Sequence, residues 1–115
     1  MIIEKISVNI DDNIKDLNVY IGENAQDNWD IITRSKQNDI WFHLDGLSSP
    51  HVILEVADLK TIPKQILIKC CNLCKEYSKY KTLNKINVIY TEVKNISKSG
   101  TVGTVITKKT KKISV

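Results

Sequence analysis

Residues 38–56 read NDIWFHLDGLSSPHVILEV, the most regular pattern in this chain of 115 residues. Apolar side chains take every second position on both sides of a loop at 46–50, at Ile40, Phe42 and Leu44 before it and at Val52, Leu54 and Val56 after it. A period of two residues places alternate side chains on one face of a β-strand. The segment therefore predicts two strands joined as an antiparallel hairpin.

Similar patterns predict further strands on either side of this hairpin. Upstream, loosely spaced apolar residues from Ile3 to Ile10 and a clean alternation from Leu17 to Ile21 flank the turn-forming sequence Asp11-Asp12-Asn13. Downstream, strands are expected at 86–90, 101–107 and 111–115.

Two segments have helical spacing. Residues 24–36 predict a short helix with Asn24 as its cap and with Ala25, Trp29 and Ile32 along one side. A longer helix is predicted with Thr61 as its cap and Pro63 in its first turn, and its apolar stripe runs through Ile66, Cys70, Leu73, Cys74 and Tyr77. The order of elements predicts an α+β fold, a mostly antiparallel β-sheet of about six strands with two helices packed on it.

Length and composition limit the class of protein. A chain of 115 residues is expected to be a single domain, 1–115, with a core of its own. The 42% of hydrophobic residues, with only four glycines and two prolines, exclude disordered and collagen-like classes. No apolar run approaches the roughly 20 residues of a membrane-spanning helix, and the first residues lack the features of a secretory signal. We therefore expect a soluble, cytoplasmic protein.

The net charge of +4 conceals two oppositely charged halves. Residues 1–59 contain 11 Asp and Glu against four Lys and Arg, whereas residues 60–115 contain 13 Lys against two Glu. Such asymmetry indicates a partner such as nucleic acid or another anionic surface. The alternative is that the halves interleave in the fold and pair their charges. Only Arg34 is an arginine, and lysines suit phosphate backbones better than bidentate reading of bases.

Seven lysines of the basic half are candidate phosphate contacts, namely Lys85, Lys94, Lys98, Lys108, Lys109, Lys111 and Lys112. Hydroxyl and backbone N–H groups between Ser97 and Gly103 could add donors. Equally, these lysines could serve only to keep the protein in solution. Trp41 and Tyr80 are the aromatic side chains expected to be free to stack on bases, whereas Trp29 and Tyr77 are expected in the core.

Cysteine and histidine residues raise the question of a metal or catalytic site. Cys71 and Cys74 have Cys-x-x-Cys spacing, but with Cys70 they lie inside a predicted helix and no second Cys pair exists. We expect thiols that fill the core or lie on the surface of the helix, in a protein from a reducing compartment, with no metal and no cofactor.

His43 and His51 lie on neighbouring predicted strands, where both imidazoles could share a face beside Asp45 and Ser48 or Ser49. A nuclease-like cluster is one interpretation. However, no nucleophile elbow, carboxylate pair or Gly-rich phosphate loop accompanies them. We expect binding and no enzymatic activity.

The run from Asn38 to Leu54 resembles the signature of the NFACT-R domain, the RNA-binding module of ribosome quality-control proteins that recruit tRNA to stalled large subunits. The matching positions are Asp39, Trp41, His43, Ser49 and His51. Residues 61–77, 87–91 and 102–103 are also similar to this family, and most of all to a branch in which the domain stands alone. The resemblance implies RNA binding connected with translation and no enzymatic activity of the domain itself.

Two differences from the family affect what the resemblance implies. Ser49-Pro50 replaces the usual Gly-Ser before the second histidine, which changes the loop. The tRNA-recruiting domain and helical arms of the large proteins, and the charged coiled-coil tail of the stand-alone branch, are not in this sequence. We therefore do not carry over the peptide-tailing activity of the large proteins.

These observations together predict a nucleic-acid-binding module for structured RNA, either tRNA or ribosomal RNA. The expected surface consists of the seven lysines, with Trp41, His43, Ser49 and His51 at its edge. DNA remains an alternative because phosphate contacts alone do not separate it from RNA. A second alternative is a protein partner or a membrane surface that binds the basic half. Translation-associated proteins and the ribosome are further candidate partners.

Overall fold

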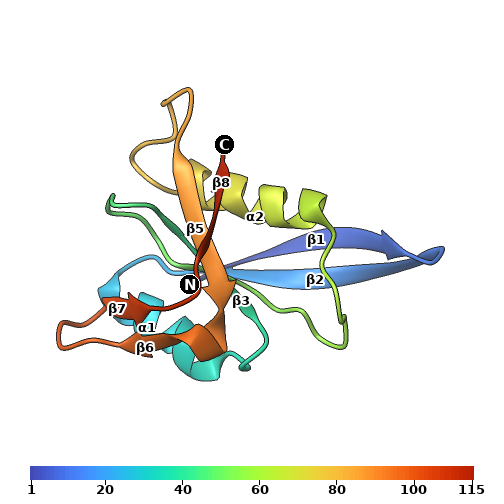
Figure 1. The fold of residues 1–115 in the computed structure, drawn as a ribbon, viewed down its shortest axis with the longest axis horizontal. Helices are drawn as coiled ribbons and strands as arrows, with labels where there is room; N and C mark the ends of the chain where they lie inside the picture. Colours follow the sequence, from blue (N-terminus) through green and yellow to red (C-terminus); the bar gives the residue numbers. More distant parts are fainter.

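The computed structural model describes residues 1–115 and contains one antiparallel sheet of six strands (Figure 1). Its strands, in the spatial order β1-β2-β4-β3-β5-β8, are β1 (Ile2–Ile10), β2 (Asn13–Ile21), β4 (Val52–Leu54), β3 (Ile40–Leu44), β5 (Asn87–Glu92) and β8 (Lys111–Ser114). The predicted hairpin of β3 and β4 is confirmed, with Trp41 opposite Ile53. The predicted α+β fold with an antiparallel sheet is confirmed as well.

A second, two-stranded sheet lies outside the main one. It consists of β6 (Ile96–Lys98) and β7 (Val105–Thr107), and a short 3₁₀ helix, η1 (Val93–Asn95), leads into it from β5. The prediction of one strand over 101–107 is therefore wrong for its first half. Residues 101–104 form a turn in which the Thr104 N–H donates to the Thr101 carbonyl at 3.0 Å. Gly103 has a φ of +88° there, a conformation that favours glycine.

Both predicted helices exist. Helix α1 spans Ala25–Arg34, and the Asn24 side chain caps it by accepting a hydrogen bond from the Asp27 N–H at 2.8 Å. Helix α2 spans Lys64–Glu76, but its cap is Pro63 and not Thr61. The Pro63 carbonyl accepts the first bond of the helix, from the Ile66 N–H at 3.0 Å.

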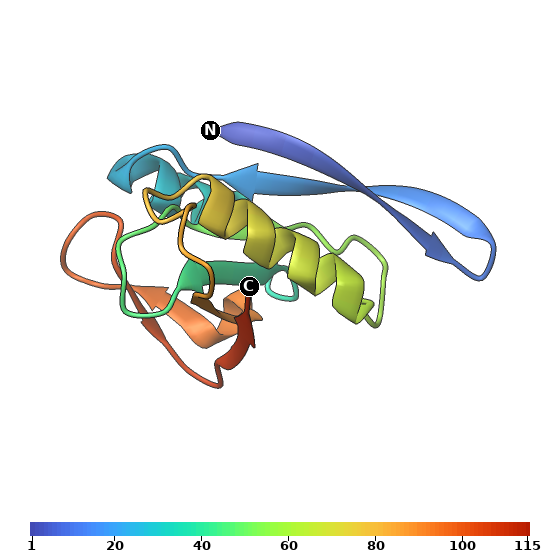
Figure 2. The same ribbon diagram turned by 90° about the horizontal axis from the view of Figure 1, so that it is seen from above.

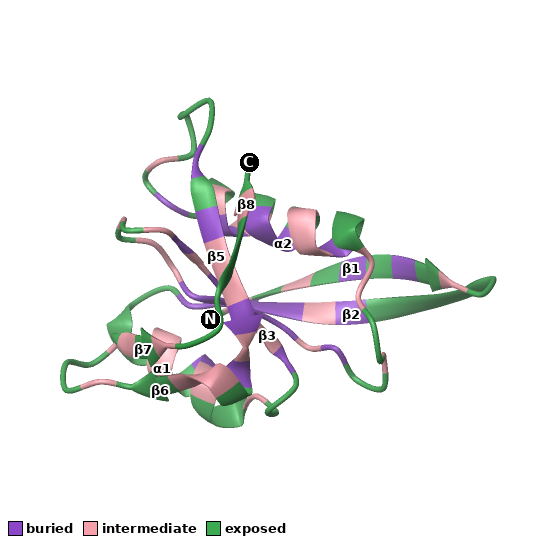
Figure 3. Cartoon of the chain, in the orientation of Figure 1, coloured by how far each residue is buried: buried purple, intermediate pink, exposed green.

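The two faces of the sheet carry separate cores. Helix α2 covers one face, where its three cysteines pack with the larger group of buried side chains, among them Val19, Phe42 and Leu54 (Figure 2). Helix α1 and the β6–β7 hairpin cover the other face, where Ile31 of α1 and Val93 of η1 pack with Tyr20, Trp41 and Ile53 of the sheet. Because both faces of β4 are covered, all three of its residues are buried and apolar. The outer part of the β1–β2 ribbon extends past this body and is largely exposed (Figures 1 and 3).

Candidate functional site

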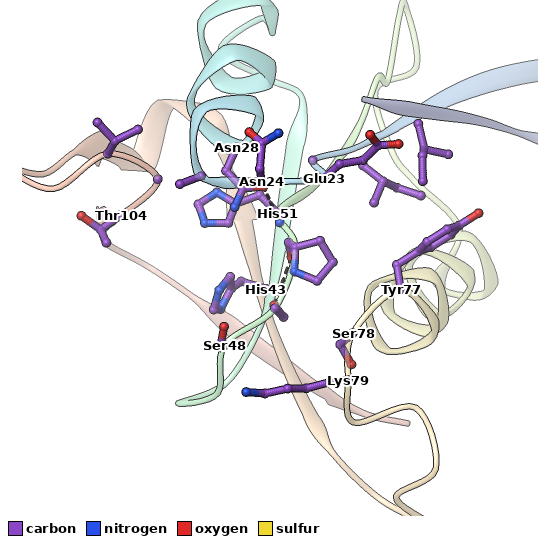
Figure 4. A pocket seen from close by; sticks show the side chains of 18 residues that line it. Glu23, Asn24, Asn28, His43, Ser48, His51, Tyr77, Ser78, Lys79 and Thr104 are labelled. Carbon is purple, nitrogen blue, oxygen red and sulfur yellow. Dashed lines mark hydrogen bonds between the residues drawn. The ribbon is translucent and has the colours of Figure 1, made fainter.

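A pocket of about 700 Å³ opens where four segments meet (Figure 4). These segments, which supply most of the lining, are the start of α1, the loop between β3 and β4, the residues that follow α2, and the turn between β6 and β7, and the ends of β1 and β2 add Ile2 and Ile21. Most of its side chains are polar. His43 and His51, the two histidines of the chain, both line it. The pocket therefore brings the predicted site residues His43, Ser49 and His51 together with segments from other parts of the fold.

The two imidazoles lie together, as the hairpin pattern predicts. Their ring centroids are 5.1 Å apart and their planes are perpendicular. The Trp41 indole stacks against the His43 ring at 5.7 Å, and its Nε1–H donates to Nδ1 of His51 at 3.0 Å. Because side chains alternate along β3, Trp41 and His43 share the sheet face covered by α1.

Trp41 itself is not free to contact a ligand. It is only 1% exposed and belongs to the core under α1. The expectation that its ring stacks on a base is therefore wrong for this structure. Alternation along the strand identifies the face on which Trp41 lies, but not the α1 and β6–β7 segments that cover it. Trp41 instead positions His51.

Hydrogen bonds assign the tautomer of each histidine. Nδ1 of His43 lies 2.6 Å from the Leu44 carbonyl and must donate to it, which leaves Nε2 as an acceptor. Nδ1 of His51 accepts from Trp41, so its proton is on Nε2. Burial lowers the pKa of His43, and burial together with repulsion from His43 lowers the pKa of His51 to about 3. Both rings are neutral at pH 7, a state suited to hydrogen bonding.

Ser49 and Asn28 hold the loop that carries His51. The Ser49 hydroxyl accepts from the Leu44 N–H at 3.1 Å and donates to the Pro50 carbonyl at 3.0 Å. Asn28 Oδ1 accepts from the His51 N–H at 3.1 Å, and the Gly22 N–H donates to the His51 carbonyl at 3.0 Å. Ser49 lines the pocket, but its hydroxyl is engaged in shaping the loop. Asn28 has the same task, and no sequence pattern pointed to it.

Asp39, another position shared with the NFACT-R signature, is structural. It is buried, and its carboxylate accepts from the backbone N–H groups of Lys36 at 2.8 Å and Val56 at 3.1 Å. These bonds connect the start of β3 with the segment that follows β4. Asp39 therefore braces the hairpin from the end opposite to the histidines.

None of the seven predicted lysines lines this pocket. Lys112 pairs with Asp45 at 2.9 Å, and Lys94 pairs with Glu92 at 3.6 Å. The Lys98 ammonium lies 5.5 Å from the Trp29 ring, while Lys109 and Lys111 line a second pocket beside the start of α2. Lys85 and Lys108 are exposed. The seven lysines therefore do not form one surface around the histidines.

Lys79 is the lysine that does line the pocket, and the sequence analysis missed it. It follows the end of α2 and lies at the histidine pocket only because α2 packs across the sheet. Its position in the basic half of the chain was the one feature of the sequence that could have indicated Lys79. Tyr77, which was expected in the core, is also at the pocket and 39% exposed, with its hydroxyl donating to Glu4 at 2.6 Å.

Charge pairing between the two halves of the chain is slight. Of the lysines in 60–115, only Lys112 forms an ion pair with a carboxylate from 1–59. The alternative that the two halves interleave and pair their charges is therefore wrong for this structure. Most of these lysines keep their ammonium groups available to an external partner.

The burial of the other aromatic side chains and of the thiols tests the remaining predictions made for them. Cys70, Cys71 and Cys74 are buried, as expected of core-filling thiols, and burial raises the pKa of Cys71 and of Cys74 to about 12. Trp29 is only half-buried and not a core residue, and its Nε1–H donates to the Thr104 carbonyl of the β6–β7 turn at 2.9 Å. Tyr80 is half-buried against the larger core and so is less free than expected.

Comparison with known families gives this site its context. Residues 8–112 match the model of the NFACT protein RNA binding domain, and this match spans most of the chain. The chain belongs to this family. The NFACT RNA-binding domain described here thus has both histidines, the α1 segment and the β6–β7 turn within the matched region. The resemblance noted at residues 38–54 is confirmed.

Several curated proteins are similar to this chain in sequence. The chain is 39% identical over 85 residues to coiled-coil domain-containing protein 25 from Danio rerio and 38% identical over 85 residues to that from Bos taurus. It is 34% identical over 84 residues to the homolog from Dictyostelium discoideum. Each match covers 70% of this chain and 41% of the relative, so the chain corresponds to less than half of these proteins.

The fold also occurs in a solved structure. It is similar to the C-terminal part of the fibronectin/fibrinogen-binding protein from Streptococcus suis, with a TM-score of 0.80 and 22% identity over 98% of this chain and 44% of that one. At this identity the likeness concerns the fold alone. Neither helix of the NFACT RNA-binding domain has the length and apolar character that crossing a bilayer requires.

Proposed function

We propose that this domain binds structured RNA, tRNA or ribosomal RNA, in the cytoplasm as part of translation or ribosome quality control. The family is one of RNA-binding domains. The observation that carries the proposal for this chain is that its 13 C-terminal lysines form almost no ion pairs with the acidic half. Unpaired lysines that neutralise phosphates release counterions, and this release supplies much of the affinity of proteins for nucleic acids.

Four lysines that line the histidine pocket or are linked to residues beside it define the face that we expect to meet RNA. Lys79 lines the pocket. Lys112 pairs with Asp45, two residues after His43, and Lys85 lies two residues before Asn87, whose carbonyl accepts from the Asp45 N–H at 2.9 Å. Lys98 contacts Trp29, which is bonded to the pocket residue Thr104. We name Lys79, Lys85, Lys98 and Lys112 the pocket-side lysines.

The remaining predicted lysines form a matched comparison set. Lys94, Lys108, Lys109 and Lys111 lie away from the pocket, and two of them line the second one. We name them the distal lysines. Replacing all four residues of either set by alanine removes the same charge, so any difference in RNA affinity reports position and not net charge.

The test measures binding of tRNA and of a ribosomal RNA fragment as a function of salt concentration. The pocket-side variant is expected to bind more weakly than the distal variant, and the slope of log K against log salt is expected to decrease by about 1 for each phosphate contact removed. Equal losses in the two variants would place the RNA elsewhere. A DNA duplex of equal length serves as competitor, and tighter binding of DNA would favour the DNA alternative over RNA.

A further inference from the structure

The histidine pocket has the dimensions of a small-molecule site. Its volume of about 700 Å³ falls within the roughly 300–1,000 Å³ of ligand pockets in proteins. Its lining mixes apolar side chains such as Pro50 and Val102 with polar ones such as Ser48 and Asn24. Because segments far apart in the sequence supply these residues, the pocket forms only when the whole domain is folded.

The floor of the pocket presents one hydrogen-bond acceptor and one donor. Neither Nε2 of His43 nor Nε2–H of His51 is bonded within the protein, and no buried side-chain nitrogen or oxygen lacks a partner. Both Nε2 atoms must therefore reach the pocket. An acceptor beside a donor suits a base edge or a ribose hydroxyl, each of which offers donor and acceptor groups.

The upper wall, where α1 begins, adds amide donors. Asn28 uses Oδ1 to hold the His51 N–H, and Asn24 uses Oδ1 to cap the helix. Both leave their NH₂ groups without a partner in the protein, and both side chains line the pocket (Figure 4). Because each amide oxygen already accepts a hydrogen bond, neither amide group can flip without losing that bond.

The charges at the two ends of the pocket differ. Lys79 is its one cation and lies at the end near Ser48 and Ser78, whereas Glu23 is its one carboxylate and lies at the start of α1 (Figure 4). Glu23 is turned toward the N-terminal ammonium of Met1, 3.5 Å away. An anionic group of a ligand would therefore lie at the Lys79 end, and the uncharged floor would receive a neutral group.

We propose that this pocket takes one unpaired nucleotide, with its base or ribose on His43 and His51 and its phosphate at Lys79. This inference rests on the proposed RNA binding and specifies which part of the RNA the pocket recognises. A base within a duplex cannot enter, because it is stacked on both faces and paired along its Watson–Crick edge. The ligand is therefore a nucleotide at a strand end, in a loop or free in solution.

The test compares two variants on two RNAs. Ser48→Trp places a bulky side chain at the exposed rim of the pocket without changing the charge, and Ser114→Trp makes the same change at an exposed position outside it. The RNAs are a blunt duplex and the same duplex with a short single-stranded overhang. Wild type and Ser114→Trp are expected to prefer the overhang RNA, whereas Ser48→Trp should lose about tenfold in affinity for it and bind the blunt duplex unchanged.

Histidine NMR resonances distinguish the sources of the ligand. The overhang RNA and free nucleoside 5′-monophosphates should both shift the ring signals of His43 and His51, and inorganic phosphate alone should not. A shift with overhang RNA but not with monophosphates would still support the proposal, with the strand as the source. Unchanged ring signals with both ligands, or equal shifts with inorganic phosphate, would overturn it.

Failure of the pocket and failure of the proposed function give different results. If the wild-type domain binds both RNAs equally and Ser48→Trp behaves like wild type, the pocket proposal is wrong while RNA binding stands. If no RNA binds but monophosphates shift the histidine signals, the pocket is a nucleotide site and the proposed RNA binding is wrong.

Discussion

The indole Nε1–H of Trp41 donates a hydrogen bond to Nδ1 of His51 at 3.0 Å, inside a core where Trp41 is 1% and His51 3% exposed. This bond sets the tautomer of His51 and so turns its Nε2–H into the pocket. It connects a residue of the fold to a residue of the site, and it also explains why tryptophan, with an N–H at the ring edge, suits this position.

Replacing Trp41 by phenylalanine should destabilise the domain, and the proton of His51 should no longer be confined to Nε2. The variant leaves Nδ1 of His51 buried without a partner, which costs about 1–3 kcal/mol, and adds a small cavity. Urea unfolding measures the loss in free energy. Trp29→Phe is the matched control, because it also removes an indole bond, to Thr104, but at a half-buried site. Equal losses in the two variants would contradict the role given to Trp41.

Stability should fall when the pH decreases from about 6.5 to about 3, the range between the unfolded and folded pKa of His51. The folded pKa is the lower one, so the unfolded chain binds more protons in this range and is favoured as the pH falls. The lowered pKa of His43 acts in the same direction. Above pH 7 neither histidine contributes to the pH dependence.

Unfolding free energies at pH 7, 6, 5 and 4 test this expectation. His51→Gln serves as the comparison, since glutamine does not titrate and the variant should show a weaker dependence over the same range. The lowered pKa values of Asp27 and Asp58 reduce stability mainly below their ordinary value of 3.8, so they add to the loss only at the pH 4 point. A profile for the wild type that is flat from pH 7 to pH 4 would be inconsistent with buried neutral histidines.

Replacing Gly22 by alanine should disturb the His51 loop from a distance. A Cβ at position 22 would lie 2.0 Å from Asn28 Oδ1, the atom that accepts the His51 N–H. The Asn28 side chain must move, and we expect a loss of about 1–3 kcal/mol because the His51 N–H loses its partner. Gly100→Ala is the control, since a Cβ there meets nothing within 4 Å. Thermal unfolding of both variants shows whether the close approach matters.

All three cysteines should resist alkylation in the folded protein. The thiolate is the reactive form, and burial raises the pKa of each thiol, to about 12 for Cys71 and Cys74. Mass spectrometry after iodoacetamide treatment at pH 8 should find unmodified protein without denaturant and three modifications in concentrated urea. Rapid modification of the native protein would mean that α2 separates readily from the sheet.

Local patterns in the sequence were enough for most elements of the fold. Asn24 caps α1 because its short side chain can reach a helix N–H wherever a helix starts, and this needs no tertiary contact. Asp11 and Asp12 both adopt positive φ in the turn between β1 and β2, as residues of that type can. The alternation around Phe42 predicted the strands and the shared face of His43 and Trp41. These features follow from interactions within a few residues of the chain.

The sequence by itself therefore determined the α+β class, the hairpin that carries both histidines, and the family. The tertiary structure alone decided that Trp41 is buried, that Lys79 reaches the pocket, and that the seven predicted lysines lie in different places. The physical reason is that periodicity specifies the direction of a side chain relative to its own strand or helix. What covers that side chain, or lies beside it, depends on segments such as α1 and the β6–β7 turn, which are distant in sequence and meet only when the sheet is covered on both faces.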